Sequence, residues 1–196
     1  MLAFDLETTG LDPVTCSVTA ACLFGGPDPA APITKTFLFK GEDKALDLAL
    51  REELMQMLDE APILCAFNGV RFDIPFLQQA WGVEPARAQA WRVKTFDIFE
   101  ASKLALNQTF GLDRLLAANG LESKTGTGMK AIVMAMEGRW GELGDYCMQD
   151  TRMTYMVSTL PVIILPLNTF RDERVVIDRA HPSLFKFISI SQTNLN

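Results

Sequence analysis

The chain has 196 residues, 48% of them hydrophobic and 21% charged, and its formal net charge is −6. This length is enough for one folded domain with its own core, and the composition excludes extensive disorder. The acidic balance excludes broad, salt-driven coating of nucleic acid, although bound divalent cations can reverse the local sign of an acidic pocket.

The cysteines and the apolar stretches give no sign of zinc fingers, disulfides or membrane spans. Cys16, Cys22, Cys65 and Cys147 lack CxxC spacing and neighbouring histidines, so we expect reduced thiols. We expect no signal peptide, and the most apolar late stretch, residues 153–167, is too short and too interrupted by prolines to cross a bilayer. We therefore expect a soluble intracellular protein, cytoplasmic or nuclear, with no membrane partner.

Three strands are predicted at the start of the chain. The first, residues 2–6, alternates apolar side chains with others, and this period of two places Asp5 and Glu7 on the same face. Residues 14–24 and 33–39 are rich in β-branched and aromatic side chains, and the segment between them is rich in glycine and proline. This pattern predicts a hairpin with a long loop.

An amphipathic helix is predicted next, over residues 42–60. Leu46, Leu50, Leu54 and Met57 recur there at helical spacing, and the opposite side is charged. We expect this apolar stripe to pack on the sheet.

The remaining elements alternate between strand and helix. In chain order they are a buried strand over 63–67, a helix over 73–81, a strand over 93–99, and helices over 110–118, 129–137 and 142–160. Three leading antiparallel strands followed by helices and parallel strands predict an α/β sandwich with a mixed five-stranded sheet. We assign the domain to residues 1–165 and expect residues 166–196 to be a C-terminal extension packed on it, with a frayed end.

Asp5 and Glu7 are the first candidate site residues. Two positions apart on one strand, their Cα atoms lie about 7 Å apart on the same side, close enough to share a divalent ion. An exposed sheet face with two solvated carboxylates would produce the same spacing. However, the flanking apolar residues predict a central strand, where buried carboxylates are costly unless a cation compensates them.

Two later segments supply further acidic candidates. Asp73, in NGVRFD, falls at the start of a predicted helix, where an ordinary N-cap is the simpler interpretation. Tyr146 and Asp150, in DYCMQD, lie four apart and so share a helix face, as any surface pair would. Neither segment indicates a function by itself.

Together, the three segments resemble the motifs of the DEDD superfamily of exonucleases, which have an RNase H-like fold. FDLETTG is similar to the first motif, NGVRFD to the second, and YCMQD to the third in the form that marks the tyrosine subclass. That subclass includes the proofreading domains of DNA polymerases. The resemblance covers residues 2–160 with the motifs in the right order, and it implies a three-layer α/β sandwich.

The resemblance also implies a two-metal-ion active site. Asp5, Glu7 and Asp150 would hold one divalent ion, and Asp5 with Asp73 a second, about 4 Å away. Oxygen ligands suit Mg²⁺ or Mn²⁺. Tyr146 would orient the attacking water by hydrogen bonding, because the pKa of a free tyrosine, about 10, is too high for a strong base at neutral pH.

The same resemblance also implies residues that bind the substrate. Thr8, Thr9 and Gly10 come where the chain turns away from the sheet and would touch the terminal nucleotide. Asn68 and Phe72 would contact sugar and base, although a turn asparagine and a buried aromatic explain them almost as well.

Two other titratable residues are expected outside the metal site. Asp97 ends a predicted strand, and we expect it to cap a helix or accept hydrogen bonds. His181, the single histidine, is expected to be structural or at the surface.

The sequence therefore predicts a 3′–5′ exonuclease that releases nucleoside 5′-monophosphates from single-stranded or frayed ends. The expected partner is the 3′ end of DNA or RNA, with DNA slightly favoured, and a polymerase or a replication or repair protein is a possible second partner. The alternatives are a non-catalytic module that binds nucleic acid or a polymerase, and a purely structural α/β domain. Loss of a metal ligand would favour the first alternative, and all four carboxylates are present.

Overall fold

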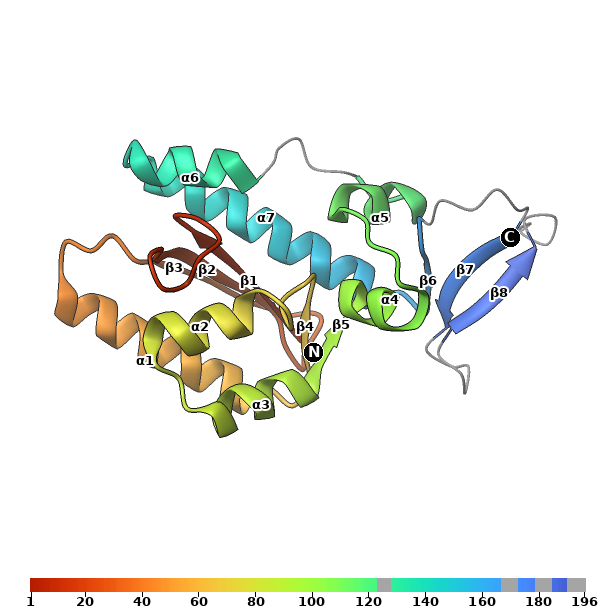
Figure 1. Cartoon of the computed structure of the whole chain (residues 1–196), viewed down its shortest axis with the longest axis horizontal. Helices are drawn as coiled ribbons and strands as arrows, with labels where there is room; N and C mark the ends of the chain where they lie inside the picture. Colours follow the sequence, from red (N-terminus) through yellow and green to blue (C-terminus); the bar gives the residue numbers. More distant parts are fainter. Residues whose placement is uncertain (123–127, 167–172, 179–184, 190–196) are drawn as a thin grey trace.

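The first strand of the chain lies in the middle of a mixed five-stranded sheet. The computed structural model describes residues 1–122, 128–166, 173–178 and 185–189, and its elements are labelled in Figure 1. The strands of this sheet are β1 (Leu2–Thr8), β2 (Val18–Gly25), β3 (Ile33–Leu38), β4 (Leu64–Ala66) and β5 (Thr95–Asp97).

The strand order across the sheet is β3-β2-β1-β4-β5. β1 pairs antiparallel with β2, and β2 pairs antiparallel with β3. In contrast, β1 pairs parallel with β4, and β4 pairs parallel with β5. The predicted change from antiparallel to parallel pairing is confirmed. β1 is therefore a central strand, paired with β2 along its length and with β4 over its first residues.

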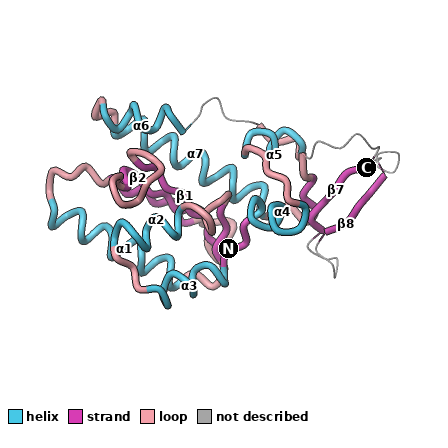
Figure 2. The backbone as a smooth tube through the Cα atoms, in the orientation of Figure 1, coloured by secondary structure: helices cyan, strands magenta, loops and turns pink. Residues whose placement is uncertain are grey.

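Helices cover both faces of the sheet (Figures 1 and 2). One face carries α1 (Lys44–Glu60), α2 (Asp73–Trp81) and α3 (Pro85–Lys94). The other face carries α6 (Gly128–Met136) and α7 (Trp140–Ser158). Two further helices, α4 (Ile98–Leu106) and α5 (Leu112–Ala118), follow β5. The predicted three-layer architecture is confirmed.

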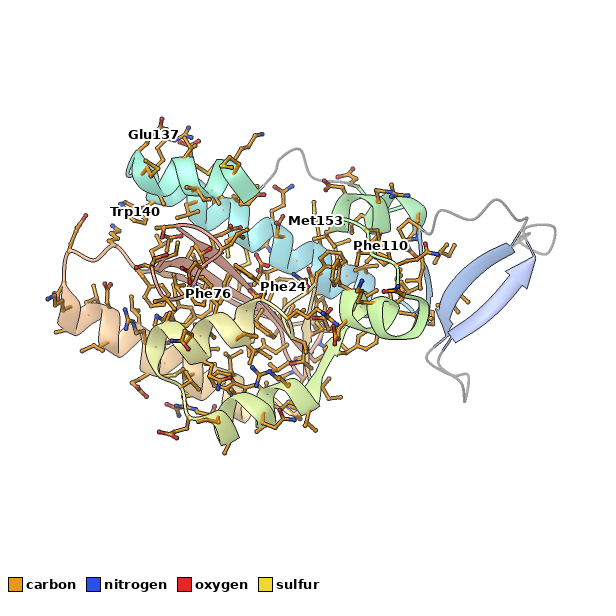
Figure 3. The ribbon with its side chains drawn as sticks, viewed as in Figure 1. Phe24, Phe76, Phe110, Glu137, Trp140 and Met153 are labelled. Atoms are coloured by element: carbon orange, nitrogen blue, oxygen red, sulfur yellow. The ribbon has the colours of Figure 1, made fainter. Side chains whose placement is uncertain are left out.

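The larger core lies between the sheet and α1, α2 and α3. Phe4 and Leu6 of β1 point into it and pack with buried side chains such as Leu54, Phe76 and Trp91. Figure 3 shows side chains filling this space, with Phe76 among them. This packing explains why alternate residues of β1 are apolar, because their side chains leave water when the helices dock.

α1 packs most of the predicted stripe against the core, but not its first residue. Leu54, Met55 and Leu58 are buried, whereas Leu46 is 55% exposed. The predicted stripe was therefore wrong at its N-terminal end. Leu50 and Met57 are partly buried against the core, whereas the first turn of α1, which carries Leu46, extends beyond it.

The region before β5 also differs from the prediction. A strand was expected over residues 93–99, but α3 continues to Lys94 and β5 contains three residues. Pro85 begins this helix, in the position where a missing N–H costs nothing. Trp91 is fully buried and Val93 is 77% exposed, so Val93 belongs to the solvent face of a helix.

Small residues bring α7 close to the other face of the sheet. Ala20 and Cys22 of β2 are fully buried against Cys147 of α7. A Cβ atom on Gly144 would lie 3.0 Å from Thr36 Cγ2 of β3, so glycine permits this close approach. The helix therefore lies directly over β1 and β2.

A second, antiparallel sheet follows α7. It consists of β6 (Val162–Ile164), β7 (Glu173–Asp178) and β8 (Phe185–Ser189) in that order. Ile177 is fully buried in a cluster with Ile98 and Ile163. The sequence from residue 171 onwards gave no usable periodicity, and these two late strands were not predicted. The expected frayed end, residues 190–196, lies outside the described residues.

A search of the described residues for a membrane-crossing helix found none with the required length and apolarity.

Candidate active site

β1 presents Asp5 and Glu7 on the face that α7 covers, opposite to Phe4 and Leu6. The alternation predicted from the sequence is therefore confirmed. Glu7 is 8% exposed, and Asp5 is partly exposed. The pairing of β1 with β2 shifts register between Glu7 and Thr8, so the strand becomes irregular directly after the two carboxylates.

Asp73 is tied to the backbone of β1 between these two residues. β4 pairs with β1 only as far as Cys65, so the N–H of Leu6 lies beyond the parallel ladder. Asp73 Oδ1 accepts this N–H at 2.9 Å. Asp73 is the first residue of α2, and Phe72 occupies the N-cap position without a side-chain cap bond. The alternative interpretation of Asp73 as an ordinary N-cap is therefore wrong.

α7 contributes Tyr146 and Asp150 from one buried face. The two residues are 8% and 7% exposed. Cys147, next to Tyr146, is fully buried, and its Sγ lies 3.5 Å from the carbonyl oxygen of Asp5 and 3.9 Å from Asp5 Oδ2. The thiol of Cys147 thus brings α7 into contact with β1, the strand that carries Asp5 and Glu7.

Asp5, Glu7 and Cys147 form a compact group of potential ligands. One ligand atom from each lies within 4.8 Å of the others. In the described part of the chain, no other set of three such side chains meets this distance. The sequence analysis assigned no role to Cys147. Its position one residue after Tyr146 was visible, but the contact depends on α7 packing over β1, which spacing alone does not reveal.

Burial sets the protonation of two groups at this site. It raises the pKa of Asp73 to about 7, although the hydrogen bond from Leu6 opposes the rise and the charge of Asp97 adds to it. Burial also raises the pKa of the Cys147 thiol well above its usual value, with further contributions from Cys22 and Asp5. Cys147 is therefore a neutral thiol that can donate to Asp5. All four cysteines of the chain are free thiols.

The donor set suits hard divalent cations. Glu7, Asp73 and Asp150 are all more than nine-tenths buried, and carboxylate oxygens are the ligands that Mg²⁺ and Mn²⁺ prefer. The raised pKa of Asp73 shows that its negative charge is unfavourable in the metal-free protein. A bound cation would remove this cost, so the residues present fit such an ion.

The loop after β4 is held by Asp97, which the sequence analysis expected to cap a helix or accept hydrogen bonds. Asp97 is 4% exposed and accepts the N–H groups of Asn68, Val70 and Glu100. The bond from Glu100 caps α4. The expectation is confirmed, and the two other bonds reach the segment that leads to Asp73.

The residues expected to bind substrate lie near these carboxylates in the sequence, and their side chains contact residues close to them in the chain. Thr8 Oγ1 donates to the carbonyl oxygen of Gly10 at 2.6 Å, and Thr9 Oγ1 accepts the N–H of Ser17 at 2.9 Å. The ring of Phe72 packs on Phe76 with 5.5 Å between centroids.

Asn68 has a left-handed backbone, with φ of 68°, at the turn after β4. Contacts of the five substrate-binding candidates with nucleic acid remain predictions. His181 lies outside the described residues.

The sequence and the fold match a known class of proteins. A family model of the RNase H superfamily matches residues 2–158, and the chain belongs to this superfamily. No protein of curated function matches the sequence significantly.

Many solved structures share the fold, including the following two. One is the family B DNA polymerase from the hyperthermophilic archaeon Pyrobaculum calidifontis, with a TM-score of 0.58 and 18% identity. The match covers 79% of this chain and 23% of the polymerase. The other is described as the apo form of a nuclease, with a TM-score of 0.50 and 20% identity, and the match covers 79% of this chain and 68% of that one.

Proposed function

We propose that this protein is a metal-dependent 3′–5′ exonuclease of the tyrosine subclass of the DEDD superfamily. The observation that carries the proposal is the hydrogen bond from Leu6 N–H to Asp73, because it fixes a third carboxylate between Asp5 and Glu7 on the central strand. α7, the helix that covers this strand, adds Tyr146 and Asp150. These observations support a site built from acidic residues of three distant segments of the chain.

Membership of the RNase H superfamily supports nucleic-acid hydrolysis. The structural neighbours support it further, since one is described as a nuclease and the other as a DNA polymerase. The similarity to a DNA polymerase favours DNA as the substrate and a polymerase, or another replication or repair protein, as a partner.

The proposed metal ligands are the four carboxylates. Asp5, Glu7 and Asp150 would hold one divalent ion, and Asp5 with Asp73 a second, with Mg²⁺ or Mn²⁺ as the ions. Such ions supply an activated water and stabilise negative charge on the departing oxygen.

The reaction is hydrolysis of the terminal phosphodiester. Water adds to phosphorus and the bond from phosphorus to the 3′ oxygen breaks. This step leaves a 3′-hydroxyl on the shortened strand and a 5′-phosphate on the released nucleotide.

The protein's own groups then have distinct roles. Asp73 would hold an ion through its ionised carboxylate, so metal binding would favour loss of the proton that burial favours in the metal-free protein. Tyr146 positions the attacking water through its hydroxyl. Thr8 ends β1, and Thr9 and Gly10 begin the loop after it, where the backbone would approach the terminal nucleotide.

The test is a cleavage assay on 5′-labelled single-stranded DNA and RNA with Mg²⁺, Mn²⁺ or chelator. We expect a ladder of progressively shorter 5′-labelled products that requires metal and disappears in Asp5→Asn. Glu52→Gln, which removes one exposed carboxylate from α1, is the matched control and should cleave normally.

Two outcomes would contradict this proposal. Fragments that indicate internal cuts or removal from the 5′ end would exclude a 3′–5′ exonuclease. No cleavage of either polymer, with Mn²⁺ binding intact, would favour the non-catalytic binding module.

A further inference from the structure

Asp97 has more hydrogen bonds than the cap of one helix requires. Its Oδ1 accepts the N–H of Asn68 at 3.0 Å and the N–H of Glu100 at 3.1 Å, while its Oδ2 accepts the N–H of Val70 at 2.9 Å. The side chain is buried at the end of β5, where it pairs in register with Ala66 of β4. Two of its three donors therefore belong to the loop that leaves β4.

This loop has a conformation that needs external support. Asn68 has a positive φ, which is unfavourable for a residue with a side chain. Gly69 is closely surrounded, since a Cβ atom there would lie 2.5 Å from Ala66 Cβ and 3.2 Å from Phe4 Cζ. Val70 N–H and Asn68 N–H point to Asp97, outside any strand ladder.

The same loop sets the position of Asp73. The carbonyl oxygen of Gly69 accepts the N–H of Ile74 at 2.9 Å, so the first turn of α2 is built on the loop. Gly69 also lies beside the carboxylate, because a Cβ atom there would be 3.4 Å from Asp73 Oδ2. Asp73 in turn reaches Leu6 N–H on β1. A continuous set of contacts thus joins Asp97 to the backbone between Asp5 and Glu7.

We infer that Asp97 is a positioning residue for the proposed nuclease site, which fixes the loop of residues 67–72 and through it the carboxylate of Asp73. This inference rests on the proposed function for its catalytic consequence, but its structural part can be measured separately. Asp97 itself is not among the proposed metal ligands or substrate-binding residues. Its role corresponds to the outer partners of metal ligands, whose removal typically lowers metal affinity or activity about 10- to 100-fold.

The chemistry of the side chain makes this role specific to aspartate. Three N–H donors meet two oxygens, and an ionised carboxylate offers acceptors only. In Asp97→Asn, the amide NH₂ must face the N–H of Val70 or those of Asn68 and Glu100. Either orientation places donors against donors and releases at least one side of the loop.

The test compares Asp97→Asn with Asp59→Asn. Asp59 is a matched control because it also accepts several hydrogen bonds, from Arg87 and Trp91, but links α1 to α3 away from the site. Three quantities are measured for each variant: Mn²⁺ affinity by electron paramagnetic resonance, the chemical shift and exchange rate of the Leu6 amide by NMR, and cleavage of 5′-labelled single-stranded DNA.

We expect Asp97→Asn to bind Mn²⁺ about 10- to 100-fold more weakly, to shift the Leu6 amide resonance and to speed its exchange. We expect kcat to fall by a similar factor with little change in KM for DNA, and excess Mn²⁺ to restore part of the rate. Asp59→Asn should lower the unfolding midpoint and leave Mn²⁺ affinity and the Leu6 amide unchanged.

A folded Asp97→Asn protein with wild-type Mn²⁺ affinity and an unshifted Leu6 amide would overturn the inference. If Asp97→Asn does not fold, Asp97→Glu provides the same readings, because it keeps the charge and both acceptors but displaces them by one methylene. A wild-type protein that binds Mn²⁺ without cleaving DNA or RNA would refute the proposed function alone. The Leu6 amide and Mn²⁺ affinity would still decide whether Asp97 positions Asp73.

Discussion

The N–H of Leu6 donates to Asp73 Oδ1 at 2.9 Å, and this bond joins the start of α2 to the middle of the sheet. In a regular parallel pair, the next residue of β4 would accept this N–H. Because β4 ends first, a carboxylate replaces a backbone carbonyl at that point. Truncation of one strand therefore creates the place for an acidic group.

Asp73 should make the metal-free protein less stable as pH rises. Its pKa is about 7 in the folded protein and near 3.8 ordinarily, so between these values the folded state keeps a proton that the unfolded chain has lost. The free energy of unfolding therefore falls as pH rises from about 4 to about 7, by about 1.4 kcal/mol for each pH unit at most. Asp73→Asn keeps an acceptor for Leu6 and removes this titration.

Urea unfolding in chelator at pH 5 and pH 8 measures this effect. We expect wild type to lose more stability than Asp73→Asn between the two pH values, and Mn²⁺ to abolish the difference. Equal losses in the two proteins would show that the Asp73 carboxyl group is not perturbed.

Tyr146→Phe should slow cleavage without weakening metal binding. Loss of the hydroxyl removes one positioning hydrogen bond from the attacking water, and we expect kcat to fall about tenfold, equivalent to about 1.4 kcal/mol. The other tyrosine, Tyr155, packs edge-on against Phe24 at 5.3 Å, and Tyr155→Phe is the control. Equal kcat values for the two variants would remove Tyr146 from the mechanism.

Gly69→Ala should destabilise the protein and disturb the site together. The new methyl group would meet Ala66 Cβ at 2.5 Å and Phe4 Cζ at 3.2 Å, contacts that force the loop or β1 to move. Overpacking of this kind costs about 1–3 kcal/mol. Chemical denaturation and Mn²⁺ titration should both reveal the change. Gly111→Ala, where the added Cβ meets no atom within 4 Å, should match wild type in both measurements.

We propose that residues 166–196 form an extension that stabilises the domain of residues 1–165 without taking part in catalysis. Ile177 of β7 is fully buried in the cluster with Ile163, so Ile177→Ala should cost about 2–5 kcal/mol in unfolding free energy. Val162→Ala, at a position 37% exposed, is the control and should cost much less.

Removal of residues 166–196 tests the same proposal more severely. The shortened protein should melt at a lower temperature and still cleave DNA with a similar kcat below that temperature. Loss of cleavage in a protein that remains folded would place part of the active site in the extension.

Local patterns predicted much of this fold. The period of two in β1 placed Asp5 and Glu7 on one face, and the bounds of α2 were predicted as Asp73–Trp81, as observed. These features depend on neighbours in the chain. Residue 93 was misassigned because an apolar side chain on an exposed helix face resembles a strand residue when viewed alone.

Contacts between distant segments could not be predicted in the same way. The thiol of Cys147 reaches Asp5 because small residues allow α7 to lie close to β1 and β2. The three N–H donors around Asp97 come from two segments of the chain. Because β4 ends early, Leu6 N–H donates to Asp73 and not to a carbonyl oxygen of β4. Such distances depend on packing of the whole domain, which periodicity does not encode.

The central position of β1 has a consequence for protein synthesis. On the ribosome, β1 emerges before α7, which covers it and begins only at Trp140. A nascent polypeptide therefore exposes Asp5 and Glu7 long before Asp150 is made. If translation stops before residue 150, the released fragment lacks Asp150, so under the proposed function it should not cleave nucleic acid.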